Sequence, residues 1–474
     1  MQRIAIVSEH ASPLAQLGGV DSGGQNVYVA NVARELARQG HCVDVFTRLD
    51  NPYLSDQMEW DNNVRVIHVR AGPVCPLPKE SLLPYMKQFG EYMQDYVREH
   101  GMQYDVIHAN FFMSALAAMP LARETRTPLA VTFHALGKVR RLHQAQNDRF
   151  SDHRFSIEED IVRDADCIIA ECPQDRRDLM ELYDADPRRI SMVPCGYDPC
   201  ELAPIDMRAA REMLGWDPDT FHLLQLGRMV PRKGIDNVIR ALARLRGSHG
   251  VNARLCVVGG NLSGGSASDL GELDRLMRVA EDEQVADFVQ FTGCRERGVL
   301  SRYYSAADVF VTTPWYEPFG ITPIEAMACR RPVIGSDTGG IKYTVVDGET
   351  GYLVPPKDAD ALAAKLAILA NNRQLAARMG WAGAMRARNL FTWRRVGTEL
   401  ASLFQSLRRP EGRARWMPAH SIRSLATDLR VSPALRDGAG HAAGPRSPAS
   451  GGPPRHAGRA REETPADWPA FFTG

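Results

Sequence analysis

The stretch EPFGITPIEA, residues 317–326, places two glutamates on either side of a Phe-Gly-Ile-Thr-Pro turn. Seven residues separate Glu317 from Glu325. The apolar runs DVFVTT (308–313) and PVIGSD (332–337) flank the stretch and are typical of short buried strands. The pattern therefore predicts a strand, a turn, a helix and a second strand, with both carboxylates near the turn.

One of these glutamates has a structural explanation in the sequence itself. Thr322 and Glu325 fit the T-x-x-E pattern of a helix capping box, with Pro323 at the first helical position. Glu317 precedes that helix and has no such explanation. A carboxylate can accept hydrogen bonds from sugar hydroxyls, so we expect Glu317 to serve a ligand.

Short β-branched runs alternate with longer helical patterns over about the first 390 residues, which predicts βαβ units and parallel sheets. Three prolines in VPCGYDPCELAP (193–204) interrupt the alternation before it starts again. We therefore expect an α/β chain of two doubly wound, Rossmann-like domains, residues 1–200 and 201–388, facing a shared cleft. A helix over 389–408 should return toward the first domain. The Pro/Gly/Ala/Arg-rich tail 409–474 should be disordered.

Each short β-branched run is predicted to be one strand. Besides the two that flank the glutamates, the predicted strands are residues 3–8, 42–48, 64–70, 104–110, 129–135, 167–172, 190–195, 221–228, 254–260 and 288–293. Single helices are expected over 26–40 and 81–100.

The composition excludes several classes of protein. With 474 residues and 44% hydrophobic content, the chain can bury the cores of ordinary soluble domains. Lys+Arg and Asp+Glu both number 57, so no net charge would attract nucleic acid or an acidic membrane. No apolar run reaches the ~18 residues of a transmembrane helix. We expect no signal segment, because MQRIAIVSEH (1–10) has the pattern of a strand. The nine cysteines include no C-x-x-C pair, so we expect reduced thiols, a cytoplasmic location and no zinc.

Two further features suit a phosphorylated ligand. The stretch LGGVDSGGQNVYV (17–29) places four glycines before a predicted helix, where backbone N–H groups favour phosphate. In the second domain, Arg228 ends a strand and Lys233 precedes a helix, and two such cations suit a diphosphate. Because no G-x-G-x-x-G follows a strand, the dinucleotide fingerprint is not met, which argues against an NAD oxidoreductase.

These residues together resemble a known family. Glu317 and Glu325, with Arg228 and Lys233 upstream, look like the E-x7-E and R-x4-K signatures of retaining glycosyltransferases of group 1 (family 4), which have the two-Rossmann GT-B fold. The resemblance covers about residues 1–407 and is most specific in 313–356. The stretches DSGGQNVYV and FHALGKVRR are similar to those of sucrose-phosphate synthases and of D-inositol-3-phosphate glycosyltransferases.

The resemblance implies donor-side roles for the matching residues. Glu325 would bind the ribose hydroxyls, Glu317 the transferred sugar, and Arg295 would lie near the base. The diphosphate would be bound by Arg228, Lys233, Gly23, Gly24, Gly320, Ile321 and Thr322. His134 would lie beside the anomeric carbon and contact the sugar's 6-hydroxyl or shape the acceptor side. His134, Glu317, Arg228 and Lys233 are thus the expected catalytic residues, and no metal or other cofactor is implied.

The acceptor side matches the family less closely. Lys79, Arg154 and Asn26 are the expected acceptor contacts, with the two cations suited to an acceptor phosphate. The sugar-phosphate-using relatives carry a tyrosine where this chain has Phe111 and a Ser or Thr where it has Ala135, and both departures remove hydroxyls. Arg330 replaces the family's usual glycine after the Glu325 helix.

The expected function is hexosyl transfer from a nucleotide-diphosphate sugar, with UDP-glucose or UDP-GlcNAc favoured, to a small hydroxyl acceptor that includes sugar or inositol phosphates. Two alternatives stay open at this point: a nucleotide-sugar hydrolase or epimerase, and a catalytically silent nucleotide-sugar binder. The expected partners are small molecules only, with neither nucleic acid nor integral membrane association. The oligomeric state is open, with a homodimer as one alternative.

Overall fold

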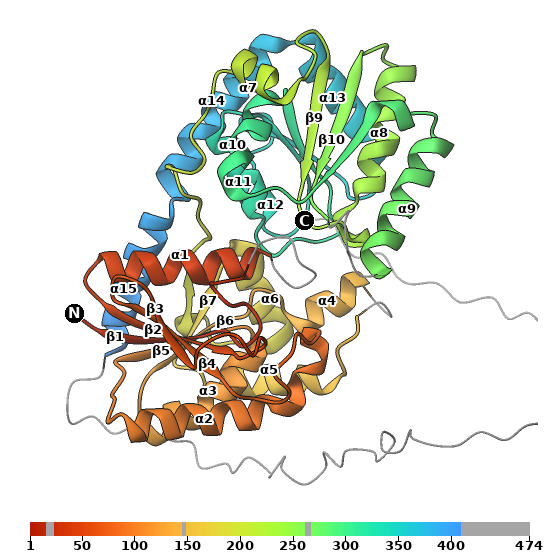
Figure 1. Cartoon of the computed structure of the whole chain (residues 1–474). Helices are drawn as coiled ribbons and strands as arrows, with labels where there is room; N and C mark the ends of the chain where they lie inside the picture. The colour runs from red at the N-terminus through yellow and green to blue at the C-terminus, as the bar shows by residue number, and fades with distance from the viewer. Residues whose placement is uncertain (16–22, 145–147, 261–266, 409–474) are drawn as a thin grey trace, which may run out of the picture. The chain divides into compact units, whose positions relative to one another are not determined.

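The computed structural model describes residues 1–15, 23–144, 148–260 and 267–408 (Figure 1). The described chain up to residue 408 falls within one compact unit, Met1–Trp416. The tail 409–474, predicted to be disordered, lies outside the described residues.

The N-terminal part of the chain forms an eight-stranded sheet in the order β3-β4-β2-β1-β5-β6-β7-β8. Every neighbouring pair is parallel except β3 and β4. The strands are β1 (Arg3–Val7), β2 (Cys42–Arg48), β3 (Gln57–Asp61), β4 (Val64–Val69), β5 (Val106–Asn110), β6 (Leu129–Thr132), β7 (Cys167–Ala170) and β8 (Ile190–Met192). The helices are α1 (Gly24–Arg38), α2 (Met86–Glu99), α3 (Phe112–Thr125), α4 (Gly137–Gln144), α5 (His153–Asp164) and α6 (Pro173–Tyr183).

The second sheet is six-stranded and entirely parallel, in the order β11-β10-β9-β12-β13-β14. Its strands are β9 (Phe221–Leu226), β10 (Ala253–Val258), β11 (Val289–Gly293), β12 (Val309–Thr312), β13 (Val333–Ser336) and β14 (Gly351–Val354). The helices that follow along the chain are α7 (Met207–Leu214), α8 (Ile235–Gly247), α9 (Ala267–Asp282), α10 (Arg297–Ala306), α11 (Ile321–Ala328), α12 (Ile341–Thr344), α13 (Ala359–Asn371), α14 (Arg373–Leu390) and α15 (Trp393–Leu407). The predicted α/β fold with two Rossmann-like parallel sheets is confirmed.

The structure corrects three details of the predicted elements. Strand β3 was missed because it pairs only with β4 and alternates exposed and half-buried residues. Strand β14 was missed because its four residues directly follow a turn. The single helix predicted over 81–100 is wrong at its start: two short 3-10 turns, Lys79–Ser81 and Leu83–Tyr85, precede α2. Pro84 lies in the second of them, and a proline disrupts the interior of an α-helix.

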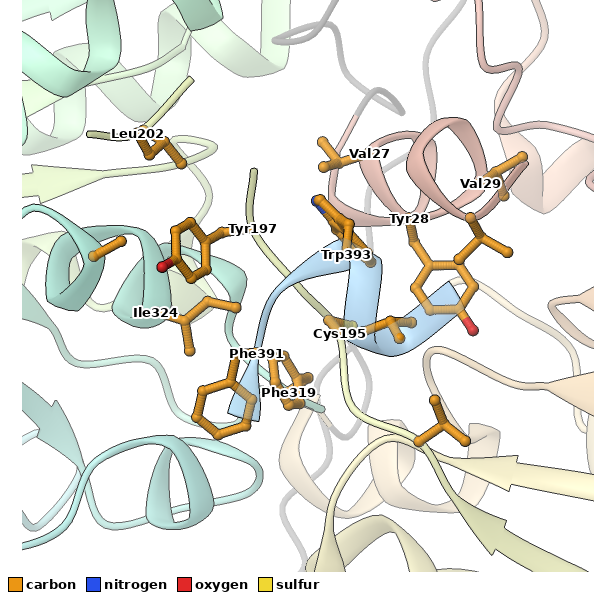
Figure 2. Packing of buried hydrophobic residues seen from close by; sticks show 14 of the residues in the cluster. Val27, Tyr28, Val29, Cys195, Tyr197, Leu202, Phe319, Ile324, Phe391 and Trp393 are labelled. Atoms are coloured by element: carbon orange, nitrogen blue, oxygen red, sulfur yellow. The ribbon is translucent and has the colours of Figure 1, made fainter. Parts of the chain in front are cut away.

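The two segments that connect the sheets are hydrogen-bonded to each other. Tyr197 donates its N–H to the Phe391 carbonyl at 2.8 Å, and Trp393 donates its N–H to the Tyr197 carbonyl at 3.1 Å. Figure 2 shows Trp393 beside Tyr28 of α1 and Phe391 beside Phe319, with ring centroids 5.9 Å apart in both pairs. The chain thus crosses between the sheets along one paired strap, the pairing of Tyr197 with Phe391 and Trp393.

After that strap, helix α15 packs on α1. A Cβ built on Gly397 would lie 2.6 Å from the Glu35 Cβ, so glycine permits the close approach of the two helices. Val396, Leu400 and Phe404 are fully buried on the same face. The last described helix is therefore part of the core under the N-terminal sheet.

Candidate active site

One cavity of about 320 Å³ is lined by residues that follow strands of both sheets. Strand ends of parallel sheets are where loops converge to form ligand sites. All but one of the residues predicted for the site line this cavity: Gly23, Gly24, Asn26, Lys79, His134, Arg228, Lys233, Arg295, Glu317, Gly320, Ile321, Thr322 and Glu325. The exception is Arg154.

The two predicted halves of the anion site are close together. A Cβ built on Gly23 would lie 3.5 Å from Arg228 Nε, and one on Gly24 would lie 3.6 Å from Ile321 Cδ1. Side chains at these positions would fill the space between α1 and the loops after β9 and β12. The described part of the glycine-rich stretch, from Gly23 onward, therefore brings bare backbone to the cationic wall of the cavity.

Glu317 lies among cations. Lys233 Nζ is 2.5 Å from Glu317 Oε2, and Arg232 Nη1 is 3.6 Å from the same oxygen. Arg228 lines the cavity beside them. Arg232 was not singled out from the sequence, because an arginine next to a lysine in a polar turn has the pattern of a solvated surface pair. Among the described residues, the Glu317 carboxylate thus lies beside Lys233 and Arg232, and Arg228 lines the same wall, so cations gather where an anionic ligand could bind.

The charges of this cluster shift one another's pKa. Burial acts to raise the pKa of Glu317, but the charges of Lys233 and Arg232 outweigh it and the pKa is lowered. Burial lowers the pKa of both Lys233 and Arg232, and Glu317 offsets part of that effect. Desolvated cations of this kind gain more from binding an anion than exposed ones do.

The structure shows that Glu325 belongs to no capping box. Helix α11 begins at Ile321, two residues earlier than predicted, because Gly320 adopts φ +92° and forms the N-cap. Glu325 lies deeper in the helix, where Tyr304 donates its hydroxyl to Oε2 at 2.8 Å and Arg297 Nη1 lies 3.2 Å from Oε1. Tyr304 and Arg297 thus fix the orientation of this buried carboxylate. The prediction from the sequence that Glu325 caps the helix was wrong.

The first turn of α11 faces the cavity. Gly320, Ile321 and Thr322 line it at the first turn, where N–H groups lack helical partners. Arg295 follows β11 and donates from Nε to the Tyr303 hydroxyl at 3.0 Å. It lines the cavity near the Glu325 end, together with Arg297.

His134 enters the cavity from the end of β6. Its Nδ1 donates to Glu171 Oε1 at 2.9 Å, and its Nε2 lies 3.0 Å from Asn110 Oδ1. Its backbone has φ +57°. Glu171 was not singled out from the sequence, where a glutamate after an apolar strand carries no distinguishing signal.

Arg154 is the site prediction that the structure does not support. Its side chain is 1% exposed and donates from Nε to Glu158 Oε1 at 2.7 Å. The guanidinium packs on Phe111, Phe112 and Phe150, within 4.7 to 5.0 Å of their ring centroids. A guanidinium covered by these rings cannot reach a ligand in the cavity.

Arg140 is a further cation of the cavity that Lys79 also lines. It lines the cavity, and its guanidinium pairs with Asp148 at 3.1 Å. Burial lowers the pKa of Arg140, and the charges of Arg154 and Arg232 lower it further against the attraction of Asp148. Its Nε is buried without a hydrogen-bond partner among the described residues. In the sequence, Arg140 could not be told from Arg141 beside it.

The structure shows where the three family departures noted in the sequence lie. Arg330 has φ +60°, the left-handed conformation that glycine adopts most easily, and its guanidinium lies 4.9 Å from the Trp381 ring centroid. Phe111 and Ala135 both line the cavity. Nothing among the described residues forms a His, Cys, Asp or Glu group that could hold a metal ion.

The chain also resembles known proteins over most of its length. The family model described as glycosyl transferases group 1 matches residues 206–386, and the model of glycosyltransferase family 4 matches residues 22–201. The D-inositol 3-phosphate glycosyltransferase of Corynebacterium efficiens is 34% identical over 407 residues, which are 85% of this chain and 95% of that protein. The chain belongs to the group 1 (family 4) glycosyltransferases.

Further matches place this glycosyltransferase among similar enzymes. The D-inositol 3-phosphate glycosyltransferase of Geodermatophilus obscurus is 36% identical, over 85% of this chain and 89% of that one. The structure of sucrose-phosphate synthase from Thermosynechococcus elongatus has a TM-score of 0.79 and 34% identity, over 86% of this chain and 99% of that one. HepE from Anabaena, solved with UDP-glucose, shares the fold, with a TM-score of 0.67 and 20% identity over 86% of this chain and all of that one.

Two predictions concern the wider setting of the enzyme. Among the described residues, no helix is both long enough and apolar enough to cross a membrane. No disulfide bond joins any of the nine cysteines, all of which lie in the described part of the chain. The cytoplasmic location and the oligomeric state remain predictions.

Proposed function

We propose that this glycosyltransferase transfers a hexosyl group from a nucleotide-diphosphate hexose to a hydroxyl of a sugar phosphate or an inositol phosphate, with retention of the anomeric configuration. The observation that carries the proposal is that Arg232 and Lys233 lie beside Glu317, on the cavity wall that Arg228 also lines. Cations gathered in this way on one wall suit the diphosphate of a donor.

The donor would span the cavity from Glu325 to Glu317. The aimed carboxylate of Glu325 suits the two ribose hydroxyls, which would replace or share the hydrogen bonds from Tyr304 and Arg297. Arg295 would lie near the base, and Glu317 would accept hydrogen bonds from the transferred sugar. The open first turn of α11 and the backbone at Gly23 would contribute N–H groups to the diphosphate.

Departure of the diphosphate is the step these residues would promote. Negative charge grows on the leaving diphosphate as the glycosidic bond breaks, and fixed cations nearby stabilise that charge more than they stabilise the intact donor. Arg228, Arg232 and Lys233 would supply this stabilisation, with no metal ion required. The acceptor hydroxyl would attack on the face that the diphosphate leaves, so the configuration would be retained.

The acceptor would lie against the N-terminal wall of the cavity. Lys79, Arg140 and Asn26 line this wall, and the two cations suit a phosphate on the acceptor. The name of the Corynebacterium relative indicates an inositol phosphate, and that of the Thermosynechococcus enzyme indicates sucrose phosphate. Both names favour a small phosphorylated acceptor or product.

The test has two stages. Thermal unfolding with UDP, GDP and ADP, each at about a hundred times its dissociation constant, should show a stabilisation of roughly 2.7 kcal/mol for the correct nucleotide. Incubation of the matching nucleotide hexose with myo-inositol phosphates, fructose 6-phosphate and glucose 6-phosphate should then release nucleotide only when the right acceptor is present. Release at the same rate without any acceptor would indicate a hydrolase, and failure of all three nucleotides to bind would refute the proposal.

A further inference from the structure

His134 has a backbone conformation that needs support. It has φ +57°, in the left-handed region that a residue with a Cβ rarely adopts. Backbone of this kind persists when the surrounding structure holds it in place, and it clusters at functional sites. Side chains around His134 must therefore hold it in this conformation where it lines the cavity.

Glu171 holds the ring. A carboxylate only accepts hydrogen bonds, so Nδ1 of His134 is the donor in the 2.9 Å contact with Glu171 Oε1. The Cys195 thiol donates to the same carboxylate oxygen at 3.1 Å. Burial alone would raise the pKa of Glu171, but the charge and hydrogen bond of His134, with the bond from Cys195, lower it. Glu171 is therefore an anion that fixes one edge of the ring.

The rest of the ring is also committed to protein contacts. Nε2 lies 3.0 Å from Asn110 Oδ1, so both ring nitrogens already have protein partners. The ring of Tyr28 meets that of His134 edge to face, with centroids 4.8 Å apart. The imidazole is thus oriented on three sides and has no spare nitrogen with which to take a proton from an acceptor hydroxyl.

Arg154 and Glu158 hold the backbone that follows His134. Arg154 Nη2 donates to the Ala135 carbonyl. Glu158 accepts the Gly137 N–H at 2.9 and 3.1 Å through its two oxygens. A Cβ built on Gly137 would lie 2.8 Å from Glu158 Oε2, so this segment rests directly on the ion pair.

We infer that Glu171 and the Arg154–Glu158 ion pair are positioning residues that hold the His134 ring and backbone in the one orientation that glycosyl transfer requires. The inference rests on the proposed function and gives Arg154 a role other than acceptor binding. A buried ion pair contributes little net stability compared with well-packed apolar side chains. The value of these charges therefore lies in the orientation that they impose on the loop from His134 to Gly137.

The first experiment compares steady-state kinetics of three variants. Glu171→Met removes the acceptor for Nδ1 at similar size and should lower kcat at least tenfold, while the donor KM changes less than twofold because the diphosphate-binding cations follow β9. Glu171→Gln keeps an oxygen that can accept and should recover part of the loss. Asp175→Asn is the matched control: Asp175 accepts the Glu171 N–H and is buried, but no contact joins it to His134. It should have near wild-type kcat.

A double-mutant cycle separates positioning from general damage to the fold. If Glu171 acts through His134, the Glu171→Met change should cost little more in a His134→Ala background, because the group it positions is gone. Equal losses in both backgrounds, or wild-type kcat in Glu171→Met, would overturn the inference.

A measurement without turnover distinguishes this inference from the proposed function. The ring ¹⁵N resonances of His134, assigned by their loss in His134→Gln, should shift in Glu171→Met and stay in place in Asp175→Asn. If wild-type protein transfers no sugar but these resonances shift as expected, the proposed function fails and the positioning of His134 stands. If they are the same in Glu171→Met and wild type, the positioning is refuted whatever the activity.

Discussion

Replacement of Glu317 by glutamine should weaken the fold and strengthen the binding of a nucleotide diphosphate. The Glu317 side chain is 17% exposed and faces Lys233 at 2.5 Å and Arg232 at 3.6 Å. Removal of one partner of a buried pair costs about 3–5 kcal/mol, and partial solvent access at this site reduces the expected cost to about 2–3 kcal/mol. For a domain of about 200 residues, where 1 kcal/mol corresponds to about 2–4 °C, the melting temperature should fall by roughly 4–12 °C.

UDP should restore much of that loss. Its diphosphate would replace the missing negative charge beside Arg228, Arg232 and Lys233. If affinity rises tenfold, the nucleotide adds about 1.4 kcal/mol more stabilisation to Glu317→Gln than to wild type. UDP lacks the sugar that Glu317 is expected to hold, so the substitution removes no contact to it. Sugar transfer by the variant should nevertheless fall at least tenfold.

Scanning calorimetry with and without saturating UDP, at low salt, measures both effects. Glu349→Gln, which changes an exposed carboxylate of the same domain, is the control and should match wild type. Equal melting temperatures of Glu317→Gln and wild type would refute the reasoning about buried charge. A smaller UDP shift in Glu317→Gln than in wild type would show that Glu317 contacts the nucleotide itself.

Two further predictions concern residues that line the cavity, and a third concerns Asp175, which accepts the Glu171 N–H. Arg228→Ala and Lys233→Ala should each lower turnover at least tenfold, about 1.4 kcal/mol in the barrier, and unchanged kinetics in both would refute the diphosphate assignment. Arg140→Ala should raise the KM for a phosphorylated acceptor at least tenfold. Arg141→Ala is the control and should leave this KM unchanged, because it removes a more exposed side chain paired with Asp152. Equal KM values in the two variants would exclude Arg140 from the acceptor site. Burial and the nearby Glu171 raise the pKa of Asp175 from 3.8 to about 8. Between those pH values the folded state holds a proton that the unfolded state releases, so the stability of the wild type should fall as pH rises. Asp175→Asn should therefore gain stability over wild type as pH increases from 4 to 8, and parallel curves of melting temperature against pH would contradict this.

The fold could be predicted from the sequence because buried parallel strands need continuous apolar runs. Strands β3 and β14 escaped because one is a partly exposed edge and the other has four residues after a turn. The start of α11 was misplaced because the T-x-x-E pattern was present while the φ of Gly320 decided where the helix begins. Local sequence patterns do not show which residue takes a left-handed conformation.

Where residue type and spacing are specific, as for Glu317, Lys233 and Gly23, the sequence sufficed to predict residues that the structure brings together around one cavity. Arg140, Arg232 and Glu171 were missed because their importance depends on burial, and in the sequence each resembles an ordinary surface charge. Arg154 was misassigned for the same reason: of the three phenylalanines that cover it, only Phe150 is close in the sequence, whereas Phe111 and Phe112 lie far earlier, at the start of α3. Charge can be read from a sequence, but the solvent exposure of that charge comes from the tertiary structure.

The paired strap of Tyr197 with Phe391 and Trp393 bears on how this enzyme can be recombined with its relatives. A chimaera that exchanges the N-terminal half at a single junction near residue 200 would join a foreign α1 to the native α15, where Glu35 and Gly397 must fit without a gap. The exchangeable unit is discontinuous in the gene: the segment before Tyr197 and the segment from Thr392 to Leu407 must come from the same parent. Hybrid enzymes built with both junctions should express as folded protein, and those with one junction should be found largely in the insoluble fraction.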